Sequence, residues 1–287
     1  MPNYRINKTD NIDQTKRISF KFDGKTYFGF KGDTLASALL SNGIHLIGRS
    51  FKYHRPRGIM SCGSEEPNAI CQINHNTNLN EPNVRATEIE IYEGLEASSQ
   101  NCWPSVNFDI GGINNIISPF IPAGFYYKTF MWPKSFWKNV YEPLIRKTAG
   151  LGKSPKVPDP EIYDHRHVYC DVLVIGGGIS GIMSAKLAAK NNFNTILVDD
   201  KNTLGGSTIY QNNENFKIDN KISKKWLSKE IEELRKFKNL TIKVRTSLAS
   251  YHSYNYLLAK ENLTDHLSKD NKNSEIRQRL WKIRAKK

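Results

Sequence analysis

The sequence predicts an α/β chain in which a small β-grasp domain precedes an incomplete Rossmann-like domain of the two-dinucleotide-binding type. The first domain is of the 2Fe-2S ferredoxin-like type but lacks the cysteines of a cluster. Near the N-terminus, alternating apolar residues flank the turn Asp23-Gly24, and a short helix follows. In the second half, an apolar run leads into a glycine-rich loop, an alanine-rich helix and a second apolar run that ends in an acid. We expect a β-grasp domain over residues 1–100, a connecting segment over 101–165 and the Rossmann-like domain over 166–287.

Composition excludes several classes of protein. The 287 residues are 38% hydrophobic and 24% charged, which argues against a disordered or collagen-like chain. No apolar run reaches the roughly 20 residues that a membrane span requires, so no membrane partner is expected. The 42 Lys and Arg residues against 28 Asp and Glu give a net charge of +14, but the basic residues are dispersed and no nucleic-acid-binding motif accompanies them. We therefore expect no nucleic-acid partner, and a basic surface that faces solvent or an acidic partner chain.

The N-terminal domain begins with a predicted hairpin and a helix. Apolar residues alternate before and after Asp23-Gly24, and Asp33 or Thr34 can cap a helix that Gly43 ends. The four cysteines of the chain are too scattered for a disulfide scaffold and indicate reduced thiols in a cytoplasmic protein. A plant-type cluster needs C-x4-C-x2-C and a fourth cysteine, whereas Cys62 and Cys71 are nine positions apart. We therefore predict no metal and no iron–sulfur cluster, and a structural or interface role for this domain.

Two further segments have an unusual composition. The stretch from Arg49 to Gly58 places four cationic side chains around two aromatic ones. It could bind a phosphate, a carboxylate or an acidic chain, or its arginines could pair with local carboxylates such as Glu65 and Glu66. Residues 102–160 are crowded with aromatics and prolines. Because that much aromatic surface is costly in water, we expect this segment to cover the flanking domains or another subunit.

The most specific motif is the glycine-rich loop after the apolar run 171–175. Gly176, Gly178 and Gly181 fit G-x-G-x-x-G, in which the first glycine permits a tight turn, the second lets a pyrophosphate approach and the third lets helix and strand pack closely. Ile179 and Ser180 lie at the start of the following helix, whose N–H groups are available to phosphates. We predict a dinucleotide site here, with no catalytic residue and no metal ligand among these residues.

Acidic residues and a second pair of glycines complete the predicted site. Asp199 follows the second strand, about 20 residues after the glycines, and is placed to accept hydrogen bonds from ribose hydroxyls; its neighbour Asp200 is the alternative. An acid at this position favours NAD or FAD over NADP. Gly205, Gly206 and Ser207 lie where flavoproteins of this type pass the pyrophosphate, or they form an ordinary turn.

Blocks of sequence along nearly the whole chain resemble the N-terminal part of the alpha subunits of heterotetrameric sarcosine oxidases. The similarity is found in stretches that share their order and spacing with that family: residues 32–40, 49–58, 65–69, 125–130, 149–152 and 170–178. The resemblance implies an oxidoreductase that demethylates sarcosine to glycine, with release of hydrogen peroxide and transfer of a one-carbon unit to tetrahydrofolate. It further implies NAD in the alpha subunit at Gly176, Gly178, Gly181 and Asp199, FAD in the beta subunit and FMN between alpha and beta.

The resemblance also implies partners, which are the beta, gamma and delta subunits. The alpha subunits of that family are several times longer, so we expect an N-terminal fragment that does not oxidise sarcosine alone. Two other interpretations stay open. The chain could be an FAD-dependent electron-transfer subunit of an opine or amino-acid dehydrogenase complex, or a non-catalytic assembly module.

Overall fold

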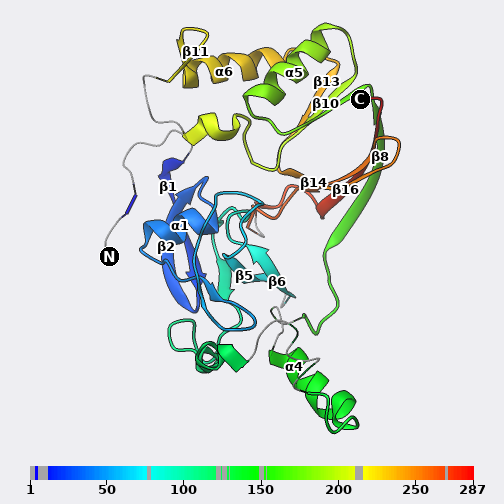
Figure 1. The fold of residues 1–287 in the computed structure, drawn as a ribbon. Coiled ribbons are helices and arrows are strands. Elements are labelled where there is room, and N and C mark those ends of the chain that lie inside the picture. The colour runs from blue at the N-terminus through cyan, green and yellow to red at the C-terminus, as the bar shows by residue number, and fades with distance from the viewer. Residues whose placement is uncertain are drawn as a thin grey trace. The chain divides into compact units, whose positions relative to one another are not determined.

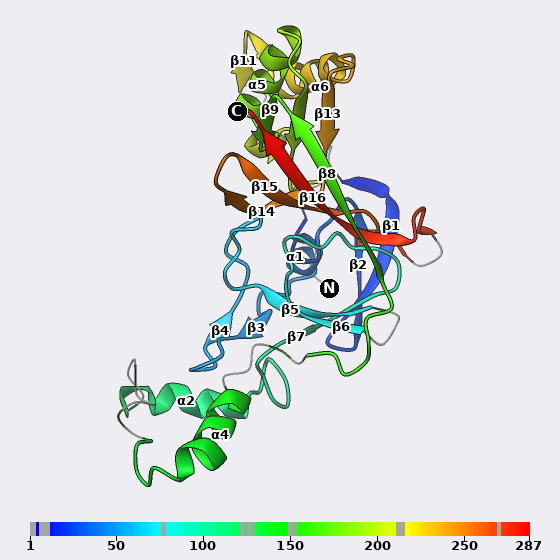
Figure 2. The same ribbon diagram turned by 90° about the vertical axis from the view of Figure 1, so that its right-hand side faces the viewer.

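The structure is a computed structural model that describes residues 4–5, 12–75, 79–120, 124, 128, 130–148, 152, 154–210, 216–268 and 271–287. It divides into two compact units, Met1–Pro160 and Glu161–Lys287 (Figures 1 and 2). The aromatic segment after residue 101 therefore groups with the N-terminal unit. Among the described residues, no helix has the length and apolar character to cross a membrane.

The N-terminal unit is built on a mixed five-stranded sheet in the order β2-β1-β7-β5-β6. Its strands are β1 (Asp13–Phe22), β2 (Lys25–Lys31), β5 (Ile70–His75), β6 (Leu79–Arg85) and β7 (Leu95–Ser99). The predicted hairpin is confirmed, since β1 and β2 pair antiparallel across Asp23-Gly24, whereas β1 and β7 are parallel. A short two-stranded ribbon, β3 (Gly48–Arg49) with β4 (Pro56–Arg57), lies outside this sheet.

Helix α1 (Leu35–Ser41) packs against the five-stranded sheet and closes the core of this unit. It begins with a capping box, in which the Ser37 N–H donates to Thr34 Oγ1 at 3.2 Å and the Thr34 N–H donates to Ser37 Oγ at 3.0 Å. Thr34 is therefore the cap, and Asp33 has another role. Leu35 and Leu39 of this helix are fully buried among apolar side chains of the sheet.

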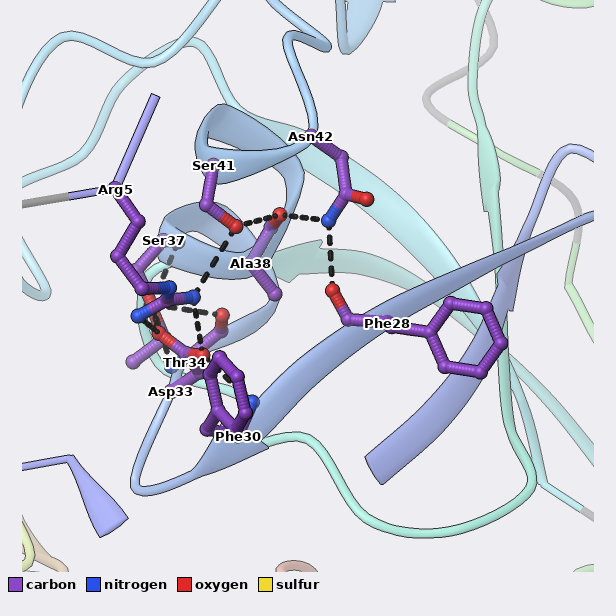
Figure 3. A network of polar contacts seen from close by, with 9 residues as sticks. All are labelled: Arg5, Phe28, Phe30, Asp33, Thr34, Ser37, Ala38, Ser41 and Asn42. Atoms are coloured by element: carbon purple, nitrogen blue, oxygen red, sulfur yellow. Dashed lines mark hydrogen bonds and ion pairs between the residues drawn. The ribbon is translucent and has the colours of Figure 1, made fainter. Parts of the chain in front are cut away.

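The carboxylate of Asp33 is fully buried and joins the start of α1 to the rest of the domain (Figure 3). Arg5 donates to both of its oxygens, with distances of 3.1 Å from Nη1 to Oδ1 and 2.6 Å from Nη2 to Oδ2. The Phe30 N–H and the Ser37 hydroxyl donate to the same carboxylate at 2.9 and 2.7 Å. The Asp33 carboxylate has no access to water. The four hydrogen-bond donors replace the water that a buried charge would otherwise need.

The remaining elements of the N-terminal unit are short helical segments: η1 (Ile110–Gly112), α2 (Ile113–Ile116), η2 (Ser118–Phe120), the π-helical turn η3 (Trp137–Tyr141) and α4 (Glu142–Thr148). Several of their aromatic and aliphatic side chains are open to solvent. Leu144 of α4, for example, is 58% exposed and Ile116 of α2 is 78% exposed.

The C-terminal unit has three layers, with a parallel sheet in the middle. The sheet order is β13-β10-β9, formed by β9 (Val172–Ile175), β10 (Thr195–Val198) and β13 (Leu240–Lys243). Helices α5 (Ile179–Lys190) and α6 (Ser223–Leu234) pack on one face through a core that includes Ile182, Leu197 and Trp226. The 3-2-1 strand order is that of one half of a Rossmann fold.

The third layer is a four-stranded sheet in the order β14-β15-β16-β8. It consists of β8 (Ile162–Cys170), β14 (Thr246–His252), β15 (Tyr256–Asn262) and β16 (Ile276–Ala285). Its side chains form a second core with Ile196 and Val198 of β10, on the face opposite the helices. A small ribbon of β11 (Lys217–Ile218) and β12 (Lys221–Ile222) precedes α6. The parallel sheet is therefore buried on both faces, as such sheets require.

Candidate dinucleotide-binding site

The turn from β9 into α5 requires glycine at two positions of the motif. Gly176 has φ +96°, and a Cβ on Gly181 would lie 1.8 Å from the carbonyl oxygen of Gly176. A Cβ on Gly178, in contrast, would meet nothing within 4 Å. The three glycines of the motif thus differ: Gly176 makes the turn, Gly181 packs helix on strand, and Gly178 leaves the space above the loop open.

The N-terminus of α5 supplies hydrogen-bond donors at this loop. Gly178 is the N-cap and no side chain caps the helix. The first N–H groups of an α-helix have no acceptor within the helix, so those of Ile179, Ser180 and Gly181 are available to a ligand. Their alignment with the helix dipole favours a negatively charged group such as a diphosphate.

Asp199 lies directly against the glycine loop. Its Oδ2 accepts the N–H of Gly177 at 2.5 Å, and its Oδ1 accepts the N–H of Lys201 at 2.8 Å. Burial is the main influence on this side chain and raises the pKa of Asp199 above its ordinary value, against the effect of the two N–H donors. The backbone of Asp199 bonds to Lys243 and Thr246, so the end of β10 is held on both sides. Asp200 is exposed.

The second glycine pair packs directly on the first loop. The Gly205 N–H donates to the carbonyl oxygen of Gly177 at 2.7 Å, and a Cβ on Gly206 would lie 3.0 Å from Gly178 Cα. Both have positive φ, +135° at Gly205 and +53° at Gly206. Ser207 follows in the 3-10 helix η4 (Gly206–Tyr210). The residues of the predicted site therefore lie around one loop, except for Asp200, whose side chain is exposed.

Gly177 is the residue that the motif did not single out. It bonds both to Asp199, through its N–H, and to Gly205, through its carbonyl. A Cβ at this position would lie 2.3 Å from Leu204 Cδ2 and 2.9 Å from Asp199 Oδ2. Within the run 176–178 the motif requires glycine only at positions 176 and 178. The additional glycine at 177 was therefore the signal for this contact.

Comparison with known proteins shows what the two halves of the chain are similar to. Residues 15–102 match the family described as 2Fe-2S iron-sulfur cluster binding domain, and residues 171–282 match the family of FAD dependent oxidoreductases. Sarcosine oxidase subunit alpha of Rhizobium meliloti (strain 1021) is 45% identical over all 287 residues. The chain is homologous to sarcosine oxidase subunit alpha. The corresponding subunit of Corynebacterium sp. (strain U-96) is 30% identical over 277 residues.

This homology covers only part of the relatives. The chain spans 29% of the Rhizobium meliloti subunit and 24% of the Corynebacterium subunit, so it corresponds to less than a third of either. Among solved structures, L-proline dehydrogenase from P. horikoshii covers 96% of this chain at 20% identity, with a TM-score of 0.56, and the chain covers 40% of that protein. That likeness supports the fold alone.

One cofactor prediction is corrected by the comparison. The sequence led us to exclude an iron–sulfur cluster, whereas residues 15–102 match a 2Fe-2S cluster binding domain. In the described part of the chain, no group of three or more His, Cys, Asp or Glu side chains is arranged to hold a metal ion. Cys62 is exposed, and burial raises the pKa of the Cys71 thiol to about 12. The match to a cluster-binding domain overturns our exclusion of a cluster.

The buried carboxylate of Glu66 occupies the loop between Cys62 and Cys71. It accepts four backbone N–H groups, from Met60 and Ser61 on Oε2 and from Asn68 and Ala69 on Oε1, at 2.6–3.0 Å. The alternative that Arg side chains of residues 49–58 pair with Glu66 is therefore wrong, because backbone donors surround this carboxylate. The Glu66 carboxylate thus holds the loop in place by accepting backbone N–H groups of neighbouring residues.

Proposed function

We propose that this chain is the N-terminal part of the alpha subunit of a sarcosine oxidase and that its glycine loop binds an ADP-containing dinucleotide. The observation that supports the site most directly is the hydrogen bond between Asp199 and Gly177. It holds an acid at the end of the second strand beside an open loop and a free helix N-terminus, which is the arrangement that a Rossmann site needs.

Each part of the site has a defined task in this proposal. The N–H groups of Ile179, Ser180 and Gly181 would bind the diphosphate, and the open side of Gly178 would let it approach. The carboxylate of Asp199 would accept hydrogen bonds from the ribose hydroxyls, and the loop of Gly205, Gly206 and Ser207 would border the diphosphate. A bound nicotinamide or flavin dinucleotide supplies hydride-transfer chemistry. The residues of this chain hold and orient it and contribute no proposed acid, base or nucleophile.

We propose NAD as the dinucleotide, in line with the acid at position 199 and the resemblance of the chain. FAD is the second candidate, because residues 171–282 match the FAD dependent oxidoreductases. The two share their ADP half, so the same loop could serve either. A 2′-phosphate next to the Asp199 carboxylate would be repelled, which disfavours NADP.

The proposed reaction of the whole enzyme is the oxidative demethylation of sarcosine to glycine, with hydrogen peroxide and a one-carbon unit for tetrahydrofolate as further products. The beta, gamma and delta subunits would be its partners in the cytoplasm. The beta subunit would hold the substrate-oxidising FAD, and FMN would lie between alpha and beta. We expect this chain alone to be inactive toward sarcosine.

Calorimetric titration of the purified chain with NAD, FAD and NADP tests the proposed site. We expect NAD to bind, NADP to bind at least about tenfold more weakly, a difference of about 1.4 kcal/mol, and a Gly178→Ala variant to lose NAD binding. If only FAD binds, FAD replaces NAD as the proposed dinucleotide. If none of the three dinucleotides binds, the proposed site is refuted. Peroxide release by the isolated chain with sarcosine would refute the proposed dependence on other subunits.

A further inference from the structure

Two segments of the N-terminal unit form one rigid surface that the dinucleotide site does not use. The first is the β3–β4 ribbon with its loop, residues 48–57, and the second comprises residues 103–117. His54 Nδ1 lies 2.7 Å from Asp109 Oδ2, and the Asp109 side chain is fully buried. The other oxygen of Asp109 accepts the N–H groups of Trp103 and Gly111, at 3.0 and 3.1 Å. This contact fixes the second segment on the first, and we call the two together the hairpin–helix patch.

Further hydrogen bonds hold the same two segments together. Arg49 Nε donates to the carbonyl oxygen of Val106 at 2.9 Å, and Asn114 Nδ2 donates to that of Lys52 at 3.3 Å. A Cβ on Gly111 would lie 2.3 Å from the imidazole of His54, so only glycine allows this packing. His54 itself has φ +53°, a backbone conformation that non-glycine residues rarely adopt. A surface maintained by this many constraints is preformed for binding.

The hairpin–helix patch concentrates positive charge. Lys52 Nζ lies 4.8 Å from the centre of the Tyr53 ring and Arg55 Cζ lies 4.7 Å from it, so two cations share one aromatic ring. Arg55 and Arg57 donate to the side-chain oxygens of Asn115 and Asn68, at 2.8 and 3.2 Å, which are neutral amides. Within the part of the chain that the structure describes, these neutral acceptors leave the charge of the two exposed arginines uncompensated.

The same patch exposes a large apolar area. Its exposed side chains include Phe51 at 48%, Trp103 at 68%, Phe108 at 69%, Ile113 at 56% and Ile116 at 78%. Aromatic side chains and arginine are the residue types enriched in protein–protein interfaces, and monomeric proteins rarely leave so many apolar side chains in water.

We propose that the hairpin–helix patch is the docking surface for an acidic protein chain, which is another subunit of the same enzyme. The choice of partner rests on the proposed subunit function. Charge complementarity favours it over a second copy of this chain, because two chains of net charge +14 repel each other. A membrane is disfavoured because an interfacial helix needs an apolar face opposite a charged face, whereas α2 has four residues and none of them is charged.

Binding measurements with defined partners test the docking surface. The immobilised full chain is exposed to the remaining sarcosine oxidase subunits of Rhizobium meliloti, whose subunit alpha is 45% identical to it. We expect binding that weakens with rising salt, and at least about a tenfold loss of affinity in the charge-reversal variant R55E/R57E and in the apolar-to-polar variant F108S/I116S. The matched control K25E/K31E reverses two exposed charges on β2 and should bind within about twofold of wild type.

Each other outcome has a defined meaning. If wild type binds and both patch variants bind equally well, the docking surface is refuted and the subunit function stands. If wild type does not bind, the subunit function fails and the docking inference fails with it. Retention of wild-type chain, but not of R55E/R57E, on phosphatidylserine vesicles would assign the patch to a membrane and overturn the proposal. Circular dichroism and thermal unfolding of each variant establish that it is folded.

Discussion

Asp199 and Gly177 are 22 positions apart in sequence, and a hydrogen bond of 2.5 Å joins the carboxylate of one to the N–H of the other. The contact connects the end of β10 to the turn after β9. An acid in this position therefore does two things at once: it holds the glycine loop through the Gly177 N–H, and it lies at the carboxyl end of β10, where Rossmann folds bind the ribose. This double role separates Asp199 from its exposed neighbour Asp200.

Replacing Asp199 should therefore lower both the stability of the glycine loop and the affinity for NAD. In Asp199→Asn, one of the two N–H donors, Gly177 or Lys201, would face an amide NH2 instead of an oxygen. We expect a loss of about 1–3 kcal/mol in the free energy of unfolding and weaker binding of NAD. Chemical denaturation and calorimetry measure the two effects. Asp200→Asn is the matched control and should change neither by more than about 0.5 kcal/mol. Equal effects of the two variants would contradict the assignment to Asp199.

Substitutions at two glycines of the motif should separate an effect on protein stability from an effect on ligand binding. In Gly181→Ala the new Cβ would lie 1.8 Å from a backbone oxygen, so helix and strand must move apart. We expect a loss of about 3 kcal/mol of stability, or failure to fold. In Gly178→Ala the Cβ enters open space, at φ −70°, so stability should stay within about 0.5 kcal/mol of wild type.

Gly178→Ala should instead weaken the binding of NAD, because the added methyl group occupies the space through which the diphosphate approaches. Thermal unfolding with and without NAD measures both quantities in one experiment. A Gly178→Ala chain that NAD still stabilises as it does wild type would show that the ligand does not pass over this residue.

Sequence alone was sufficient where the signal is local. Consecutive residues determine the hairpin around Asp23-Gly24, and they also determine the succession of strand, glycine loop, helix and strand at 171–199. The structure contains both. Strand β8 was missed because its polar stretch, with His165, Arg166 and His167, has no strand signal of its own. It forms because it pairs in parallel with β16, more than 100 positions later.

Side-chain partners were harder to foresee than elements. Glu66 was considered as a partner for arginines, yet it accepts only backbone N–H groups in the contacts described above. Gly177 was passed over because the motif does not require a glycine there. The contacts of Glu66 depend on how its loop turns in three dimensions, which residue type and spacing do not encode. For Gly177, the additional glycine in the run 176–178 was the one signal in the sequence.

The pair of Arg5 and Asp33 should make a large contribution to the stability of the N-terminal domain. Arg5→Met would leave a fully buried carboxylate with two of its four described hydrogen bonds. We expect a loss of about 3 kcal/mol in the free energy of unfolding, because an unpaired buried charge is costly. Arg17→Met is the control: Arg17 is exposed and stacks on Phe28, so its loss should cost less than about 1 kcal/mol. Urea denaturation compares the two, and similar losses would contradict the special role of the buried pair.

Glu66 should make the N-terminal domain sensitive to acid. Burial alone would raise the pKa of this carboxyl, but the four backbone N–H donors together outweigh it, and the pKa of Glu66 lies below its ordinary value of 4.5. The unfolded chain therefore binds a proton more readily than the folded one in the range just below pH 4.5. Stability from this group is fully present above that value and is lost as the pH falls through the lower, folded-state pKa.

The variant Glu66→Gln tests this linkage. Its amide would place an NH2 group against two backbone donors, so we expect a loss of about 2–3 kcal/mol at neutral pH. Because glutamine does not titrate, the variant should also lose part of the acid-induced fall in stability below pH 4.5. Glu65→Gln, at the exposed neighbouring position, should keep the wild-type profile. Urea denaturation at a series of pH values measures all three chains. An unchanged slope in Glu66→Gln would mean that other carboxylates account for the acid sensitivity, and that the four N–H groups hold Glu66 without lowering its pKa.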